Sequence, residues 1–146
     1  IEDIILNKPT QLTREEFEEI KNHTIIGYQT LLVVHQQSPE NQFIKIGLEI
    51  VRSHHERWDG TGYPDGLNGK EIPLAARVMA VVDVYDAIRS QRPYKTPVPH
   101  EQAVKEIVQA SGSHFDPQVV IAFLQKSDEL QELSEQYHGK PIRLPW

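Results

Sequence analysis

The stretch from His54 to Gly66 reads His-His-Glu-Arg-Trp-Asp-Gly-Thr-Gly-Tyr-Pro-Asp-Gly. Its glycines and its proline interrupt both helix and strand, and it is too long and too polar to be a simple turn. We interpret it as a functional loop that begins with two metal-ligand candidates, because neutral imidazole is a common ligand of zinc, iron, copper and nickel. The regions on both sides of the loop show helical patterns instead.

Helical periodicity surrounds the loop, and no convincing strand is visible in the sequence. Thr13 and Glu16 fit a capping box at the start of the first helix. Ser38-Pro39 and Asp116-Pro117 each fit an N-cap followed by a proline in the first turn. The predicted helices cover roughly residues 14–36, 39–54, 73–89 and 100–111, followed by a fifth from Pro117 and a short sixth around Leu130 and Leu133. We therefore predict an all-α protein with one domain over residues 1–138 and an irregular tail over residues 139–146.

The third predicted helix is apolar on nearly all sides from Leu74 to Ile88, so we expect it to be central to a bundle. Asp83 interrupts it. An ionised carboxylate in such a helix is costly unless it is paired or bound to a metal. The alternative is a buried aspartate that bonds a loop amide or an arginine, and the two readings have about equal weight.

Histidines form the other part of a candidate metal site. Taken singly, His54 and His55 fit one core and one solvated histidine, and His23 fits a core or boundary histidine on the first helix. Together with Asp83 they place a histidine or a carboxylate on or beside an inward face of three separate helices. A cysteine-free set of this kind suits an iron, manganese or zinc site that performs hydrolysis.

Arg92 and Lys95 flank Pro93-Tyr94 on the loop that follows the Asp83 helix. Arginine can hold a phosphate through two parallel hydrogen bonds, and lysine adds a point charge. The alternative is an exposed, solvated pair of cations. Metals beside a phosphate clamp make a phosphoesterase layout. The remaining histidines are expected at the surface or at helix caps: His35, His100, His114 and His138.

The composition limits the function classes. The 146 residues carry a net charge of -6 and include no cysteine. This charge argues against a nonspecific DNA binder or a binder of acidic membranes. The lack of cysteine excludes disulfides and thiolate zinc sites and favours a reducing compartment, so we expect a cytoplasmic protein. No apolar run approaches the ~20 residues that a membrane span needs.

The loop from His54 to Gly66 resembles the signature of the HD-GYP domains, in which Gly62-Tyr63-Pro64 corresponds to the triplet that names the family. The resemblance covers roughly residues 1–126 and implies an all-α helical bundle of the HD superfamily. Four further segments are similar to that family: Ile5 to Pro9, Asp83 to Ile88, Arg92 to Lys95 and Gly112 to Pro117.

The resemblance also implies a function and its residues. It implies hydrolysis of cyclic di-GMP to linear pGpG or to GMP in bacterial signalling, at a centre of two or three divalent ions, with iron or manganese favoured and zinc as a further candidate. His23, His54, His55 and Asp83 would bind metal. His54, His55 and Asp83 would also serve in catalysis, and Arg92, Lys95 and Tyr63 would bind substrate.

One element of the family pattern is absent. The resemblance places a His-Asp pair just upstream of Ile5 to Pro9, and the sequence starts at Ile1. We therefore expect residues 1–138 to be the C-terminal part of an HD-GYP domain, incomplete on its N-terminal side, and the fragment alone to be inactive. Two rival functions remain open: a catalytically silent receptor or interaction module, and a phosphohydrolase of the HD superfamily that acts on another nucleotide. A second copy of the chain and a protein that contacts the Gly62-Tyr63-Pro64 loop are candidate partners.

Overall fold

The computed structural model describes residues 8, 11–90 and 98–137 of the chain. Within these ranges the protein contains α-helices and one short 3-10 helix, and no β-strand. The prediction of an all-α protein is therefore confirmed. The elements are α2 (Arg14–Gln37), α3 (Gln42–Ser53), the 3-10 helix η1 (Gly69–Glu71), α4 (Leu74–Arg89), α5 (His100–Gln109), α6 (Pro117–Gln125) and α7 (Ser127–Tyr137).

Local capping explains where several of these helices begin. The side chain of Thr13 accepts a hydrogen bond from Glu16 N, and the side chain of Glu16 accepts one from Thr13 N, so the predicted capping box starts α2. Asp116 caps α6 by accepting from Gln118 N, and Pro117 occupies the first turn. The predicted start of α3 at Ser38 was wrong. Asn41 is the N-cap of this helix, because its side chain accepts from two backbone amides of the first turn.

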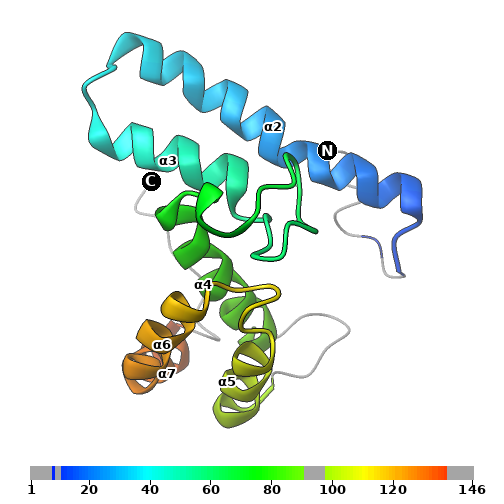
Figure 1. Ribbon diagram of the computed structural model, residues 1–146, viewed down its shortest axis with the longest axis vertical. Coiled ribbons are helices and arrows are strands. Elements are labelled where there is room, and N and C mark those ends of the chain that lie inside the picture. The colour runs from blue at the N-terminus through cyan, green and yellow to red at the C-terminus, as the bar shows by residue number, and fades with distance from the viewer. Residues whose placement is uncertain (1–7, 9–10, 91–97, 138–146) are drawn as a thin grey trace.

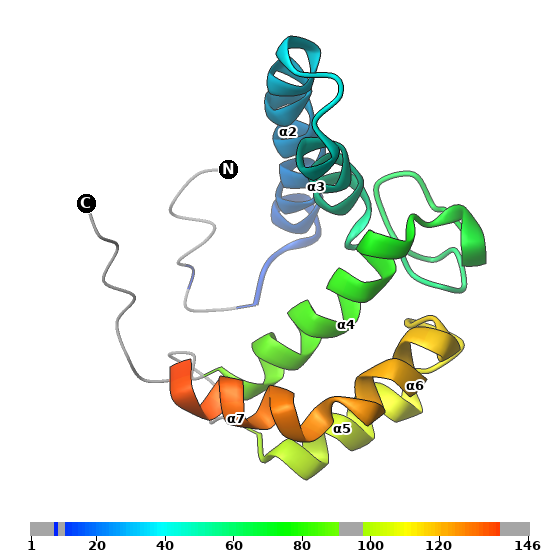
Figure 2. The same cartoon turned by 90° about the vertical axis from the view of Figure 1, so that its left-hand side faces the viewer.

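The helices form two layers joined by α4 (Figures 1 and 2). Helices α2 and α3 lie side by side as a hairpin, and α3 also contacts the start of the next layer at α4. On the other side, α4 contacts α5 and α6, and α6 contacts α7. The loop from His54 to Gly66 connects the two layers, so it lies where residues from both can meet.

The main hydrophobic core lies in the layer that contains α4, α5 and α6. Tyr85 contributes its ring from α4, and Phe123 approaches it edge-on from α6 with ring centroids 5.4 Å apart. Tyr85 also places its hydroxyl 2.9 Å from Nδ1 of His100, which gives both buried polar groups a partner. The core consists of Ala80, Val81, Tyr85, Ile88, Ala103, Ile107, Phe115, Val119, Val120 and Phe123.

Helix α4 is buried on one face only, which corrects the expectation that it lies inside a bundle. Asp83 is exposed, and the neighbouring Val78 and Val82 are 44% and 38% exposed. On α3, Phe43 is 82% exposed. The physical reason is the two-layer arrangement, in which α4 packs against α5 and α6 through one side while its other side faces solvent in the described part of the chain.

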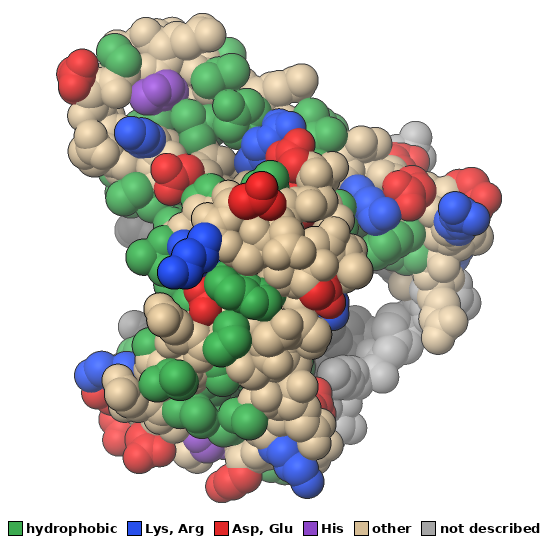
Figure 3. All heavy atoms as spheres, viewed as in Figure 1, with side chains coloured by type: hydrophobic (Ala, Val, Ile, Leu, Met, Phe, Trp, Pro, Cys, Tyr) green, Lys and Arg blue, Asp and Glu red, His purple; other side chains and the backbone are tan. Residues whose placement is uncertain are grey.

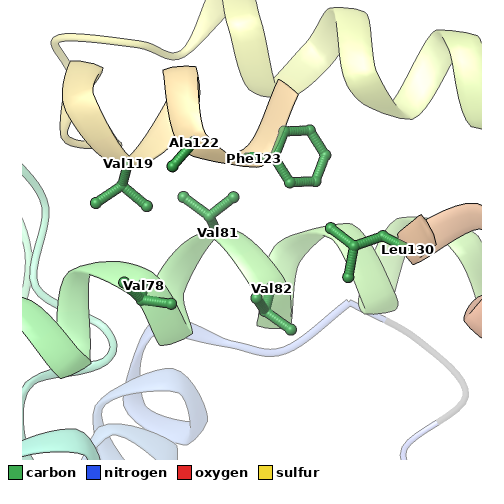
Figure 4. Close-up of a pocket in the computed structure, with 7 residues that line it drawn as sticks. All are labelled: Val78, Val81, Val82, Val119, Ala122, Phe123 and Leu130. Atoms are coloured by element: carbon green, nitrogen blue, oxygen red, sulfur yellow. The ribbon is translucent and has the colours of Figure 1, made fainter. Parts of the chain in front are cut away.

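Apolar side chains also line an open groove between α4, α6 and α7 (Figure 4). Val81 of α4 points toward Val119 and Ala122 of α6, and Leu130 of α7 closes one end. In the surface view, hydrophobic side chains reach the exterior over this lower part of the molecule (Figure 3). The described residues that line the groove come from these three helices and not from the loop that carries the candidate metal ligands.

Several predictions concern residues outside the described ranges. The segment from Ile5 to Pro9 falls almost entirely outside them, and so do Arg92, Lys95 and the expected tail over residues 139–146. None of the helices in the described ranges combines the length and apolarity that crossing a bilayer requires.

Candidate metal centre

Three of the predicted metal ligands meet at the junction of the two layers. His23 comes from the middle of α2, His54 is the C-cap residue of α3, and His55 follows it at the start of the loop. Each offers one ring nitrogen, and these nitrogens all lie within 4.8 Å of one another. The centroid of the His23 ring lies 5.5 Å from that of the His54 ring and 5.0 Å from that of the His55 ring.

Backbone carbonyls orient two of these rings. Nδ1 of His23 lies 2.6 Å from the carbonyl oxygen of Ile20, and Nδ1 of His54 lies 2.9 Å from that of Ile50. A neutral imidazole that donates from Nδ1 to a carbonyl has a lone pair at Nε2. The same use of the second ring nitrogen orients histidines that bind metals in other proteins.

The two Nε2 atoms face each other in a way that fits a shared cation. Nε2 of His23 lies 3.5 Å from Nε2 of His54. Because both Nδ1 atoms donate to carbonyls, neither Nε2 atom of the neutral rings has a proton to donate to the other. Two nitrogens that bind one ion at about 2.0–2.1 Å come to about 3.0–3.4 Å of each other. The residues present therefore fit a divalent metal ion with only a small adjustment.

His55 completes the cluster and is kept neutral. Burial, reinforced by the neighbouring His54 and His23, lowers the pKa of His55 to about 4 from its ordinary value of 6.5. A ring with this pKa carries no proton on its second nitrogen at neutral pH and offers a lone pair to a metal. The ring of Tyr63 stacks on the imidazole, with centroids 4.9 Å apart and an angle of 29° between the planes.

Glu56 holds the loop in place from inside. Its side chain is almost fully buried, with 2% exposed. One carboxylate oxygen accepts hydrogen bonds from Asp65 N and Gly66 N at 2.7 and 3.1 Å, and the other accepts from Leu67 N at 3.0 Å. A buried carboxylate is costly unless it is hydrogen-bonded, and here the backbone amides supply the partners. The far end of the loop is thereby tied back to the residue that follows His55.

The first half of the loop is hydrogen-bonded to the segment before α6. Trp58 N donates to the carbonyl oxygen of His114 at 3.0 Å, and Asp59 N donates to that of Ser113 at 2.9 Å. Arg77 of α4 pairs with Asp116 at 2.6 Å, and its guanidinium lies 5.9 Å from the Trp58 ring. These contacts join the loop to both α4 and α6.

A pocket of about 290 Å³ opens beside His55. Residues of α2, of the loop and of the segment before α6 contribute to its wall. His114, which was expected at the surface or at a helix cap, lines this pocket. Burial, followed by the charge of Arg57, lowers the pKa of His114 to about 4. The wall is formed by Phe17, Lys21, His55, Arg57, Thr61, Gly62, Tyr63 and His114.

Asp83 does not belong to the group whose ligand atoms lie within 4.8 Å of one another. Asp83 is exposed on α4. Burial raises the pKa of the Tyr63 phenol above its ordinary value of 10.0, and the negative charge of Asp83 raises it further. Tyr63 lines the pocket, whereas Arg92 and Lys95 lie outside the described residues.

Sequence reasoning missed Glu56 and the pocket residues Lys21, Arg57 and His114. Glu56 gives one local signal, since an acidic residue directly after two candidate ligands is a candidate for orienting them. The pocket residues give none, because Lys21 and His114 are far apart in the sequence and meet only through tertiary packing.

The chain resembles proteins of known activity. The sequence model described as "HD domain" matches residues 2–119. A cyclic di-GMP phosphodiesterase of Vibrio cholerae is 50% identical over 124 residues, which cover 85% of this chain and 25% of that protein. A cyclic di-GMP phosphodiesterase of Thermotoga maritima is 47% identical over 133 residues, covering 91% and 35% of the two proteins. A 3'3'-cGAMP-specific phosphodiesterase of Vibrio cholerae is 36% identical over 129 residues, covering 88% and 24%.

The chain therefore spans between 24% and 35% of the length of these curated relatives. Its fold is similar to the crystal structure of a cyclic GMP-AMP-specific phosphodiesterase from V. cholerae, with a TM-score of 0.55 and 22% sequence identity. That similarity covers 93% of this chain and 34% of the other. At this level of identity it bears on the fold, and it agrees with the predicted helical bundle.

Proposed function

Since the chain belongs to the HD domain family, we propose that it forms part of the metal-dependent active site of a phosphodiesterase that hydrolyses cyclic di-GMP. The observation that carries this proposal is the pair of Nε2 atoms of His23 and His54, which face each other at 3.5 Å with their Nδ1 atoms committed to carbonyls. His55 adds a third imidazole, and a pocket of about 290 Å³ adjoins it.

The residues of the chain have distinct tasks in this proposal. His23, His54 and His55 would hold a divalent ion, with iron or manganese favoured, zinc as a further candidate and two or three ions in the complete centre. When bound, such ions supply Lewis acidity and charge stabilisation for phosphoryl transfer. Tyr63 keeps the ring of His55 in place by stacking on it. Glu56 fixes the loop from inside and keeps Tyr63 over His55.

Two predicted roles complete the proposal. Asp83 is proposed as a further metal ligand, supported by its position near Tyr63 at the edge of the site. Arg92 and Lys95 are proposed to orient the phosphate. The product would be linear pGpG or GMP.

Two other functions are candidates beside the hydrolysis of cyclic di-GMP. The similarity to a 3'3'-cGAMP-specific phosphodiesterase makes that cyclic dinucleotide a second candidate substrate. A catalytically silent receptor would use the same pocket to bind a cyclic dinucleotide without turnover. Both alternatives share the ligand class and differ from the main proposal in selectivity or in rate.

The test is to reconstitute the full-length protein with manganese, iron or zinc and to measure turnover of cyclic di-GMP and of 3'3'-cGAMP by liquid chromatography and mass spectrometry. His54→Ala should lower the metal content and abolish turnover. His35→Ala is the matched control, because His35 lies on α2 away from the cluster. Binding of either dinucleotide by the metal-loaded protein without turnover would replace the enzyme by the receptor.

A second pair of variants separates metal binding from substrate binding. Asp83→Ala should lower the metal content, and Asp128→Ala on α7 is its exposed control. Arg92→Ala should leave the metal content near normal and raise KM roughly tenfold to hundredfold, as expected for loss of a charge-assisted hydrogen bond. Loss of metal in Arg92→Ala, or full activity in Asp83→Ala, would show that these two roles are assigned wrongly.

A further inference from the structure

We propose that the pocket beside His55 is an anion subsite, in which Lys21, Arg57 and His114 bind a phosphate group of the cyclic dinucleotide. This inference rests on the function proposed above and assigns a second set of phosphate-binding residues, separate from Arg92 and Lys95. The pocket shares His55 with the histidine cluster, so a phosphodiester that approaches the cluster also reaches the pocket.

Lys21 contributes a cation to the pocket from α2. Its ammonium lies 5.1 Å from the centre of the Phe17 ring and 5.4 Å from that of Tyr63, so two aromatic faces hold it in position. Its ion pair with Glu18, at 2.8 Å, has a largely exposed partner, since the Glu18 side chain is 57% exposed. Exposed ion pairs of this kind contribute little free energy, so the pair with Glu18 does not prevent Lys21 from binding a ligand.

Arg57 contributes a second cation from the loop. Its Nε atom donates to Thr61 Oγ1 at 3.0 Å, which fixes the direction of the guanidinium. Asp59 lies 3.8 Å away, but its carboxylate oxygen accepts shorter bonds from the hydroxyl and the amide of Thr61. Among the described residues, the two terminal amino groups of Arg57 have no hydrogen-bond partner. Arginine presents such donors to phosphate in pairs.

His114 completes the wall from the segment before α6. Its backbone is held on both sides, because its amide donates to Ala110 O at 3.0 Å and its carbonyl accepts from Trp58 N at 3.0 Å. Its ring stacks on Phe115, with centroids 4.2 Å apart and an angle of 10° between the planes. The imidazole nitrogens have no hydrogen-bond partner among the described residues, so the ring can donate to a ligand.

The walls favour a phosphate over a nucleobase. A base binds by stacking on an open aromatic face. One face of the Tyr63 ring is covered by His55, and the ammonium of Lys21 lies over the ring as well. Phe17 meets Tyr63 edge-on at 6.2 Å and is also approached by Lys21. Two cations and a hydrogen-bonding imidazole, with no carboxylate among the described residues that line the pocket, match a phosphodiester instead.

The test uses the full-length, metal-loaded protein with Lys21→Gln, Arg57→Gln and His114→Ala, and with Arg14→Gln as an exposed control on the same helix as Lys21. We expect Lys21→Gln and Arg57→Gln to raise KM for cyclic di-GMP roughly tenfold to hundredfold. Inhibition by inorganic phosphate should weaken by a similar factor, while metal content and melting temperature stay at the wild-type values. His114→Ala should have a smaller effect in the same direction, and Arg57→Lys should restore part of the affinity.

The outcomes separate this inference from the proposed function. If the wild-type protein hydrolyses cyclic di-GMP and the pocket variants behave like Arg14→Gln, the subsite is wrong and the function stands. If the wild-type protein binds cyclic di-GMP without hydrolysis, the function is wrong, and weaker binding by Lys21→Gln and Arg57→Gln still supports the subsite. The subsite would be overturned by loss of metal in Lys21→Gln or Arg57→Gln, or by a wild-type protein that does not bind phosphate.

Discussion

The ring of Tyr63 lies across the imidazole of His55, with centroids 4.9 Å apart, and the backbone amide of Tyr63 donates to the carbonyl oxygen of His55 at 3.2 Å. Tyr63 therefore contacts both the side chain and the backbone of a candidate metal ligand. Because seven residues separate the two positions, the loop must fold back on itself to bring them together. This relationship gives the loop a positioning role for the metal centre.

The aromatic ring of Tyr63, rather than its hydroxyl, should set the metal affinity. Tyr63→Ala removes the surface against which His55 stacks, so we expect the dissociation constant for manganese to rise roughly tenfold or more, in the range seen for residues that orient metal ligands. Tyr63→Phe keeps the ring and should change metal affinity little. Competition with a fluorescent chelator measures both constants. Equal metal affinity in Tyr63→Ala and the wild-type protein would exclude the positioning role.

The carboxylate of Glu56 should be needed for folding of the loop. Glu56→Gln replaces one acceptor oxygen by an amide group that cannot accept a hydrogen bond, and it takes away the partner of at least one of the three backbone amides. We expect the free energy of unfolding to fall by about 1–3 kcal/mol. Glu129→Gln, in an exposed pair with Lys126, is the matched control and should cost less than about 1 kcal/mol. Urea unfolding followed by circular dichroism compares the two variants, and equal losses would contradict the prediction.

Gly62 should tolerate no side chain. A Cβ atom at this position would lie 2.5 Å from Cα of Glu56 and would also collide with the backbone nitrogen of Arg57. Backbone atoms cannot move aside without shifting the loop, so Gly62→Ala should disturb His55 and reduce metal binding. Gly66→Ala is the comparison, since Gly66 has φ +68 and its nearest contact is a carbonyl 3.7 Å away.

For Gly66→Ala we expect a cost of only about 1–2 kcal/mol from the left-handed backbone. Its metal affinity should stay close to that of the wild-type protein, because the added methyl group makes only an ordinary van der Waals contact with the carbonyl oxygen of Gly60. Isothermal titration with manganese, together with urea unfolding, measures both effects. Normal metal affinity in Gly62→Ala would show that the close backbone approach is not required.

The stability of the metal-free protein should fall as the pH is lowered through the range from about 6.5 to about 4. Burial lowers the pKa of His114 in the folded state, so between these values the unfolded chain binds a proton that the folded chain does not. Unfolding is therefore favoured increasingly as the pH falls, and the contribution is fully present above pH 6.5. His114→Asn should make the dependence shallower without removing it, because the pKa of His55 is lowered in the same direction.

Urea unfolding of both proteins at several pH values, in the presence of a chelator, measures this dependence. The slopes should differ only within the window and should coincide above it. A slope in His114→Asn that equals or exceeds that of the wild-type protein would mean that His114 does not titrate as the structure requires.

Much of the helical framework follows from the sequence because helix boundaries are set by local interactions. The Thr13 and Glu16 capping box and the Asp116-Pro117 start both occur where the pattern predicted them. The start of α3 was misplaced because two polar residues, Ser38 and Asn41, compete as caps. Only the side chain of Asn41 reaches two backbone amides of the first turn. Membership of the HD family was equally accessible, because the loop signature is a continuous run of residues.

The tertiary structure decided which residues meet at the site. The sequence identified His23, His54 and His55 as candidates, but their convergence depends on the packing of α2 against α3 and on the backbone carbonyls that orient two of the rings. Asp83 was expected inside the bundle and is exposed, because the described residues cover α4 on one face only. Hydrophobic periodicity identifies an apolar helix but does not tell how many of its sides receive a neighbour.

The pocket also combines features that the sequence reveals with features that depend on tertiary packing. Local patterns revealed the loop and its histidines, because turn residues and adjacent ligands can be recognised within a few positions. They could not reveal that His114 and His55 line the same pocket or that Glu56 is hydrogen-bonded to three amides. Those relationships arise when the loop folds back and is tied to α4 and to the segment before α6, and such long-range contacts leave no periodic signal in the sequence.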